Sequence, residues 1–185
     1  MKTEIVIAYP VEKHSTPAGV LDPDRMIFYG GTAAGKDAPR RDIMFFAYDL
    51  KARKLLKAEP GSFDRYAILS KTTGCVYWKT KDKLGPPPKK SSGKEREVLE
   101  KGVGRKYDPQ KNTITECDSV VHVRSATRET GDGMVYGTSG RDCNIWGFDV
   151  KTEKLTELGR GNLGASTYTT TMDVDPTGRY LYYCP

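Results

Sequence analysis

The chain has 185 residues and a net charge of +6, with 19 glycines, 11 prolines and 11 tyrosines. This length suits one domain with a sizeable core, and the many turn-forming residues favour an all-β protein. No run of about 18 apolar residues occurs, which excludes a membrane-spanning helix. We expect no signal peptide, and therefore a cytoplasmic protein if Met1 is the natural start.

The first elements predicted along the chain are a β-strand near residues 5–9 and a strand-turn-strand unit at 16–29. Similar units are predicted at 65–78, 123–137 and 168–183. The last contains Asp175-Pro176-Thr177-Gly178, with Pro at the second position and Gly at the fourth, as a type I turn prefers. Thr, Val and aromatic residues flank these turns, as is typical of strands.

A second kind of hairpin lies between these units, at 45–56, 106–115 and 145–156. Each leaves its first strand through an aromatic residue and an Asp, at Asp49, Asp108 and Asp149. An Asp in this place can accept backbone N–H groups inside the turn. This aromatic–Asp step recurs after 59 and then 41 residues. The alternation of the two hairpins therefore predicts the four-stranded antiparallel blades of a β-propeller.

The positive charge is concentrated in one segment. Ten basic and four acidic residues lie between positions 79 and 106, and this excess equals the net charge of the whole chain. Pro86-Pro87-Pro88 and the Lys, Ser and Gly residues that follow favour an extended, solvated loop. Because no aromatic side chains are interleaved with these charges, we expect no nucleic-acid groove, and an acidic partner is the open alternative.

The turn at 175–178 with its following strand, and the Phe148-Asp149-x-x-Thr152 step, resemble those of β-propellers of the YVTN, TolB-like and lactonase-like kind, which are WD40-like repeat folds. The resemblance implies an all-β propeller, and the order of the hairpins predicts about three and a half four-stranded blades, an incomplete ring. We predict a single or partial propeller domain over 1–185. Its blades are predicted at about 17–59, 66–116 (with the basic insertion 79–106) and 123–158, with half a blade at 169–185.

Five residues are candidates for ligand binding. In a propeller, the loops that enter the innermost strands and those between the second and third strands open on one face, around the channel. The first set of loops contains His14, Arg65, His122 and Arg124, and the second contains Arg141. Arginine can bind a carboxylate or phosphate bidentately, so we predict a small anionic ligand in the central channel. Rim ion pairs and hydrogen-bonded histidines are the structural alternatives.

Two histidines are too few for a metal site of their own, so no metal and no cofactor are expected. The four cysteines, Cys75, Cys117, Cys143 and Cys184, form no C-x-x-C pair. We predict that they are buried free thiols. The strand Trp and Tyr residues are predicted to pack in the core and between blades.

The function predicted from these features is that of a propeller binding or scaffold domain, part of a larger protein. The alternative is a propeller enzyme of the lyase or lactonase type, acting on a small anionic sugar-derived substrate at the channel face. The resemblance transfers no catalytic residue, so catalytic residues stay unassigned and enzymatic activity stays open. An incomplete ring also predicts a protein partner or self-association, because an exposed sheet edge recruits another chain.

Overall fold

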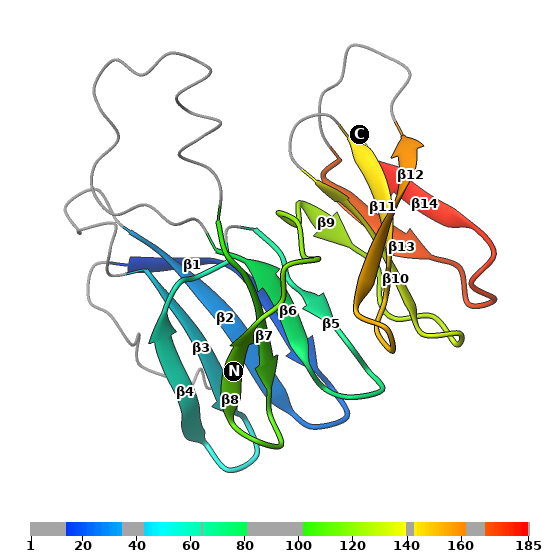
Figure 1. Ribbon diagram of the computed structural model, residues 1–185. Coiled ribbons are helices and arrows are strands. Elements are labelled where there is room, and N and C mark those ends of the chain that lie inside the picture. Colours follow the sequence, from blue (N-terminus) through cyan, green and yellow to red (C-terminus); the bar gives the residue numbers. More distant parts are fainter. Residues whose placement is uncertain are drawn as a thin grey trace, which may run out of the picture. The chain divides into compact units, whose positions relative to one another are not determined.

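The computed structural model describes residues 14–34, 43–63, 65–80, 102–139, 143–161 and 169–184. All the regular structure in these ranges is β-strand, and in every sheet each strand pairs antiparallel with the strand that follows it in the chain (Figure 1). The chain forms two compact units, residues 1–64 with 80–102 and residues 65–79 with 103–185. The strand predicted near 5–9 lies outside the described residues.

The first unit contains one four-stranded sheet, the first sheet. Its strands, in spatial and chain order, are β1 (His14–Asp22), β2 (Ile27–Ala34), β3 (Met44–Asp49) and β4 (Lys54–Pro60). The middle of β3 is buried on both faces, and its Phe45 ring lies 6.4 Å from the ring of Phe63. Phe63 in turn forms an isolated antiparallel bridge with Thr80.

The second unit contains two further four-stranded sheets and one two-stranded sheet. The second sheet consists of β5 (Ile68–Leu69), β6 (Val76–Lys79), β7 (Gly104–Asp108) and β8 (Thr113–Glu116). The third sheet consists of β9 (Ser125–Ala126), β10 (Met134–Ser139), β11 (Asn144–Asp149) and β12 (Lys154–Arg160). The fourth sheet consists of β13 (Thr171–Val174) and β14 (Leu181–Cys184). The predicted all-β architecture of three blades and a half is confirmed.

The ends of the basic segment differ from the prediction. Lys79 closes β6, and Arg105 and Lys106 lie inside β7, not in a loop. Lys106 can occupy a strand because its long side chain runs across the ring of Tyr77, with Nζ 5.7 Å from the ring centroid. Residues 81–101 lie outside the described residues.

Four hairpins share one turn conformation. An Asp carboxylate at the end of the first strand accepts backbone N–H groups within the turn at Asp22, Asp49, Asp108 and Asp149. The residue four positions later has a left-handed backbone in each case: Met26 (φ 55°), Arg53 (54°), Asn112 (54°) and Glu153 (56°). The role predicted for Asp49, Asp108 and Asp149, the carboxylates of the second kind of hairpin, is therefore confirmed.

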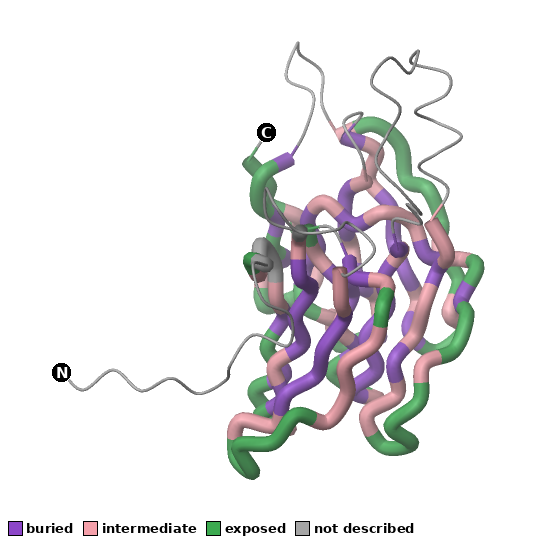
Figure 2. Tube along the Cα trace, turned by 90° about the vertical axis from the view of Figure 1, so that its left-hand side faces the viewer, coloured by how far each residue is buried: buried purple, intermediate pink, exposed green. Residues whose placement is uncertain are grey.

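The turn between β13 and β14 lies at Asp175-Pro176-Thr177-Gly178, where the sequence predicted a turn. The Gly178 N–H donates to the Asp175 carbonyl over 2.9 Å, which closes the four-residue turn. The Asp175 carboxylate accepts the N–H groups of Thr177, Arg179 and Tyr180 at 2.7–3.0 Å. Gly178 has φ 74°, a conformation that glycine adopts without a steric cost. Figure 2 shows such turns as exposed stretches between strands with many buried residues.

The core of the second unit lies between its second and third sheets. The Tyr77 and Phe148 rings, from β6 and β11, pack with their centroids 4.9 Å apart, and Ile68, Val135 and Trp146 belong to the same buried cluster. Burying large aromatic rings between consecutive sheets is the main stabilising contribution available to stacked blades.

Two predictions about burial are partly wrong. Cys75, Cys117 and Cys143 are buried free thiols as predicted, but Cys184 is exposed. The strand tyrosines are not all packing residues either, because Tyr180, Tyr182 and Tyr183 are exposed. These exceptions share a location, on or beside β14, and no other described strand pairs with the free edge of that strand.

Candidate functional site

The entry rim of the third sheet is the end at which β9 begins, and it holds two of the predicted ligand-binding residues. His122 and Arg124 immediately precede β9, and both are partly buried. The Arg124 N–H donates to the Thr138 carbonyl over 2.8 Å, which fixes the backbone at the start of the strand. Arg124 is therefore held at a defined position on the rim.

Buried hydroxyl groups line the same end of the third sheet. The hydroxyls of Ser125 and Thr138 lie 2.9 Å apart and are buried between β9 and β10. At the start of β11 the buried Cys143 thiol lies 2.7 Å from the Thr169 hydroxyl, which belongs to the segment before β13. Because these polar groups bond to one another, they can be buried without an unpaired donor or acceptor.

The structure gives less information on the other three predicted site residues. Arg65 is exposed and lies three residues before β5, at the entry end of the second sheet. His14 is the first residue of β1, in the first unit, and Arg141 lies outside the described residues. Arg65, His122 and Arg124 thus all precede an innermost strand of the second unit. A common site for the five residues stays a prediction.

The carboxylates of the turns lie at the opposite ends of the strands. Asp108, Asp149 and Asp175 all accept backbone N–H groups there, and these bonds contribute to lowering the pKa of each carboxyl below its usual 3.8. For Asp175, the hydrogen bond from Thr177 is the largest cause, and its pKa falls to about 2. Across the described ranges, no group of three His, Cys, Asp or Glu side chains is placed to hold a metal ion.

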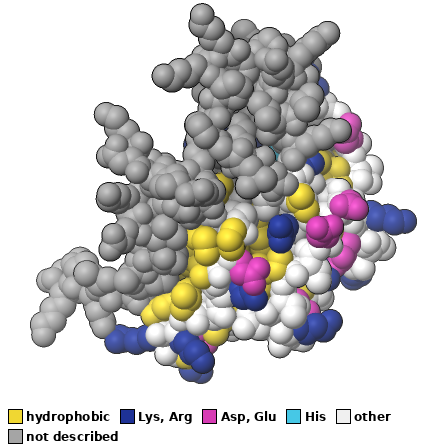
Figure 3. Space-filling model, turned by 60° about the vertical axis from the view of Figure 1, so that its left-hand side comes forward, with side chains coloured by type: hydrophobic (Ala, Val, Ile, Leu, Met, Phe, Trp, Pro, Cys, Tyr) yellow, Lys and Arg dark blue, Asp and Glu magenta, His cyan; other side chains and the backbone are white. Residues whose placement is uncertain are grey.

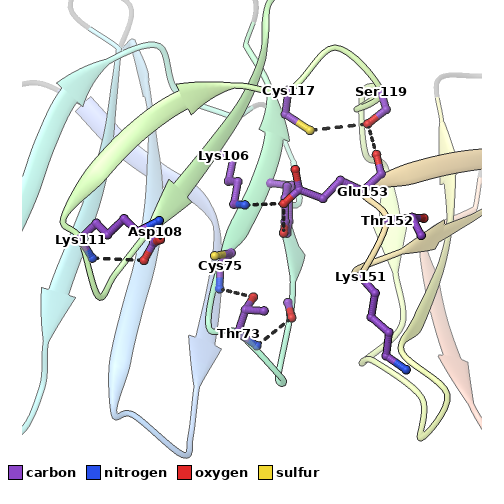
Figure 4. A network of polar contacts seen from close by, with 12 residues as sticks. Thr73, Cys75, Lys106, Asp108, Lys111, Cys117, Ser119, Lys151, Thr152 and Glu153 are labelled. Atoms are coloured by element: carbon purple, nitrogen blue, oxygen red, sulfur yellow. Dashed lines mark hydrogen bonds and ion pairs between the residues drawn. The ribbon is translucent and has the colours of Figure 1, made fainter.

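A polar cluster joins the second and third sheets, and sequence reasoning missed it (Figure 4). The Glu153 carboxylate accepts hydrogen bonds from the Tyr77 hydroxyl over 3.0 Å and from the Lys106 ammonium. The backbone carbonyl of Glu153 accepts the Ser119 hydroxyl. The left-handed backbone at Glu153 allows one residue to present both its side chain and its carbonyl to the second sheet.

The electrostatics of this cluster keep its members in complementary ionisation states. Burial, together with the nearby Cys75 and the Glu153 carboxylate, raises the pKa of the Tyr77 phenol above its usual 10.0, so the phenol remains a donor. The hydrogen bond to Glu153 raises the pKa of Lys106 above its usual 10.5. No sequence signal marked this cluster, because nothing in the pattern distinguishes Glu153 from the other residues of its turn.

Comparisons with known proteins show the fold. No family model matches the chain, and no curated protein matches it. Among solved structures, it resembles the WD40 repeats of RRP9, with 12% identity and a TM-score of 0.56 over 88% of this chain and 43% of that one. It also resembles the β-propeller domain of Myceliophteria thermophila Cps50 (Swd1), with 12% identity and a TM-score of 0.54 over 93% of this chain and 51% of that one.

A third similar structure is the hydrazine synthase of Kuenenia stuttgartiensis, with 12% identity and a TM-score of 0.57 over 96% of this chain and 45% of that one. The fold of this chain is therefore that of a β-propeller. The chain spans about half the length, or less, of the structures it matches. In the part of the chain that the structure describes, no helix is long and apolar enough to cross a membrane.

Proposed function

We propose that this chain is the propeller portion of a larger binding or scaffold protein, and that its entry rim recognises an anionic group. The observation that supports this most is the position of two arginines at the entry ends of the second and third sheets. Arg65 and Arg124 precede innermost strands, whereas the turn carboxylates lie at the opposite ends and bond to their own backbone. A guanidinium group on such a rim can bind a carboxylate or phosphate through two parallel hydrogen bonds.

The chemistry of the rim favours binding over acid–base catalysis. The Ser125 and Thr138 hydroxyls are mutually bonded and buried, whereas the partly buried Arg124 and the exposed Arg65 are charged donors on this rim. A guanidinium cannot give up its proton at neutral pH, so it can bind and orient a carboxylate or phosphate without transferring a proton.

The test is a calorimetric titration of the chain with inorganic phosphate and, separately, with glucuronate as a sugar-derived carboxylate. Loss of a charged hydrogen bond costs about 1.5–3 kcal/mol, so Arg124→Gln should weaken binding by roughly 10- to 100-fold. Arg179→Gln is the matched control, because Arg179 is an exposed arginine in the β13–β14 turn, at the other end of the strands. Its affinity should equal that of the wild type.

Absence of binding for both anions at about 10 mM, or equal affinities of wild type and Arg124→Gln, would contradict the proposal. Chemical conversion of the sugar acid or of a lactone during the titration would instead favour the lyase or lactonase alternative.

A further inference from the structure

Arg105 has a buried guanidinium nitrogen that donates no hydrogen bond. It is the second residue of β7, and Trp78 of β6 and Glu116 of β8 lie directly opposite it in the second sheet. Within the described part of the chain, no acceptor lies within hydrogen-bond distance of its buried Nε. Nearly all buried donors in folded proteins are bonded, so this nitrogen indicates an acceptor that the chain itself does not supply.

Arg105 lies on the face of the second sheet that points away from the third sheet. Its neighbour Lys106 contacts Glu153 of the third sheet, and successive side chains of a strand point to opposite faces. The face of Arg105 also carries Trp78 and Tyr107, which are both completely buried. A charge that is partly buried on such a face is costly unless an anion pairs with it.

The acidic residue nearest in register does not supply this anion. Glu116 is exposed, and the described residues show no ion pair between its carboxylate and Arg105. Other arginines do pair, as Arg128 does with Asp173 over 3.3 Å. Figure 3 shows basic and acidic side chains interspersed on the exposed surface of the protein. Arg105 differs from these surface cations in having a buried donor that is left unbonded.

We propose that Arg105 binds an oxyanion, the carboxylate or phosphate of a small molecule, through the edge of its guanidinium that Nε shares with one Nη. The two N–H groups of this edge are parallel and match two oxygens of such an anion. Because Nε is closed to solvent, the guanidinium turns on binding so that this edge meets the anion. No residue of the chain has to give up an existing bond to Nε for this to happen.

This site is separate from the entry rim. β7 is two strands away from β5, which is about 10 Å at the usual spacing of strands, and Arg65 lies beyond the start of β5. Arg124 belongs to the third sheet, on whose opposite side the face of Arg105 does not lie. Either site can therefore bind an anion without the other.

The Nε–H group of Arg105 reports binding directly in a proton–nitrogen correlation NMR spectrum of the whole chain. Arg105→Lys identifies its cross-peak by removing it. Titration with inorganic phosphate, and separately with glucuronate, should shift this cross-peak in a saturable way below about 10 mM. The cross-peak of Arg128 is the control and should show no saturable shift, because its guanidinium is already paired with Asp173.

Thermal melting separates this binding role from a structural one. Arg105→Met removes the charge and keeps a long apolar side chain, so its melting temperature without added anion should equal or exceed that of the wild type. Phosphate should raise the melting temperature of an Arg124→Gln chain, because a ligand of the folded state stabilises it. Adding Arg105→Met to that chain should reduce the rise, whereas Arg160→Met, at an exposed position of β12, should not.

Three results would overturn the proposal. The first is an Arg105 cross-peak that both anions leave unshifted at about 10 mM. The second is loss of its shift in Arg124→Gln, since that result would assign the shift to the entry rim. The third is a lower melting temperature of Arg105→Met without anion, since that result would show that the charge has a structural partner. Persistence of the shift in Arg124→Gln supports this site whether or not the entry rim binds.

Discussion

The Tyr77 hydroxyl on β6 lies 3.0 Å from Oε1 of Glu153, the left-handed residue of the β11–β12 turn. This hydrogen bond joins two consecutive sheets at the edge of their shared aromatic core. The same carboxylate receives Lys106, so a turn residue organises a junction between sheets as well as its own hairpin.

A double-mutant cycle can measure how much the hydrogen bond between Tyr77 and Glu153 contributes to stability. Tyr77→Phe keeps the ring contact with Phe148 but removes the hydroxyl donor, so the free energy of unfolding should fall by about 0.5–1.5 kcal/mol. In a Glu153→Gln background the loss should be smaller, because the acceptor has lost its charge. Urea unfolding of the four proteins measures the coupling. Strict additivity would show that the two side chains do not interact in solution.

The left-handed turn residues predict opposite effects of glycine at equivalent positions. Arg53→Gly should raise the free energy of unfolding by up to about 1 kcal/mol, because glycine has no Cβ to strain a backbone with φ 54°. Glu153→Gly relieves the same strain but removes the acceptor for Tyr77 and Lys106, so it should lower stability. Denaturant unfolding of both variants checks the signs. Stabilisation by Glu153→Gly would contradict the role given to its carboxylate.

Asp175 predicts a specific acid dependence of stability. Its carboxyl has a pKa of about 2 in the folded chain, below its usual 3.8, chiefly because of the Thr177 hydroxyl and the Tyr180 N–H. A group whose folded pKa is lowered contributes stability that is present above its unfolded pKa and lost on acidification. The contribution should therefore disappear between about pH 4 and pH 2.

Thermal melting of wild type and Asp175→Asn from pH 6 to pH 2 measures this contribution. The difference in melting temperature between the two proteins should narrow below about pH 4, because the wild-type carboxylate becomes protonated there. A difference that is constant over the whole range would show that the Asp175 carboxylate is not bonded in the folded chain.

Close packing of Trp146 on Gly137 predicts a large effect of one methyl group. A Cβ at Gly137 would lie 2.3 Å from two ring carbons of Trp146 and 2.7 Å from the Ser125 carbonyl oxygen. Gly137→Ala should therefore destabilise the chain by about 1–3 kcal/mol. Gly131→Ala is the control, because no atom lies within 4 Å of its added Cβ. Equal unfolding midpoints for both variants would contradict this packing.

Local signals in the sequence were sufficient to predict the strands and turns. The Asp carboxylates close their hairpins through nearby backbone N–H groups, so the residue type and its position determine the contact. The Asp175-Pro176-Thr177-Gly178 turn is predictable for the same reason. The exposure of Tyr182 and Cys184 was not predictable, because strand composition does not indicate whether another sheet covers a given face.

The contacts between sheets depend on residues far apart in the sequence. Glu153 meets Tyr77 across 76 positions, and no periodicity in the sequence marks that pair. The cations of the entry rim were found because strand starts can be located from the turns, and this places Arg65 and Arg124 before β5 and β9. Which side chains converge on a ligand depends on loop conformations that local patterns do not specify.

The claim that consecutive sheets stack face to face, as propeller blades do, underlies both proposals. The most direct test is a nuclear Overhauser spectrum of the chain with aromatic residues labelled. The Tyr77 and Phe148 ring centroids lie 4.9 Å apart, so strong cross-peaks between their ring protons are expected. Absence of these cross-peaks, with the Tyr77 ring protons instead close to water, would contradict the stacking of the second and third sheets.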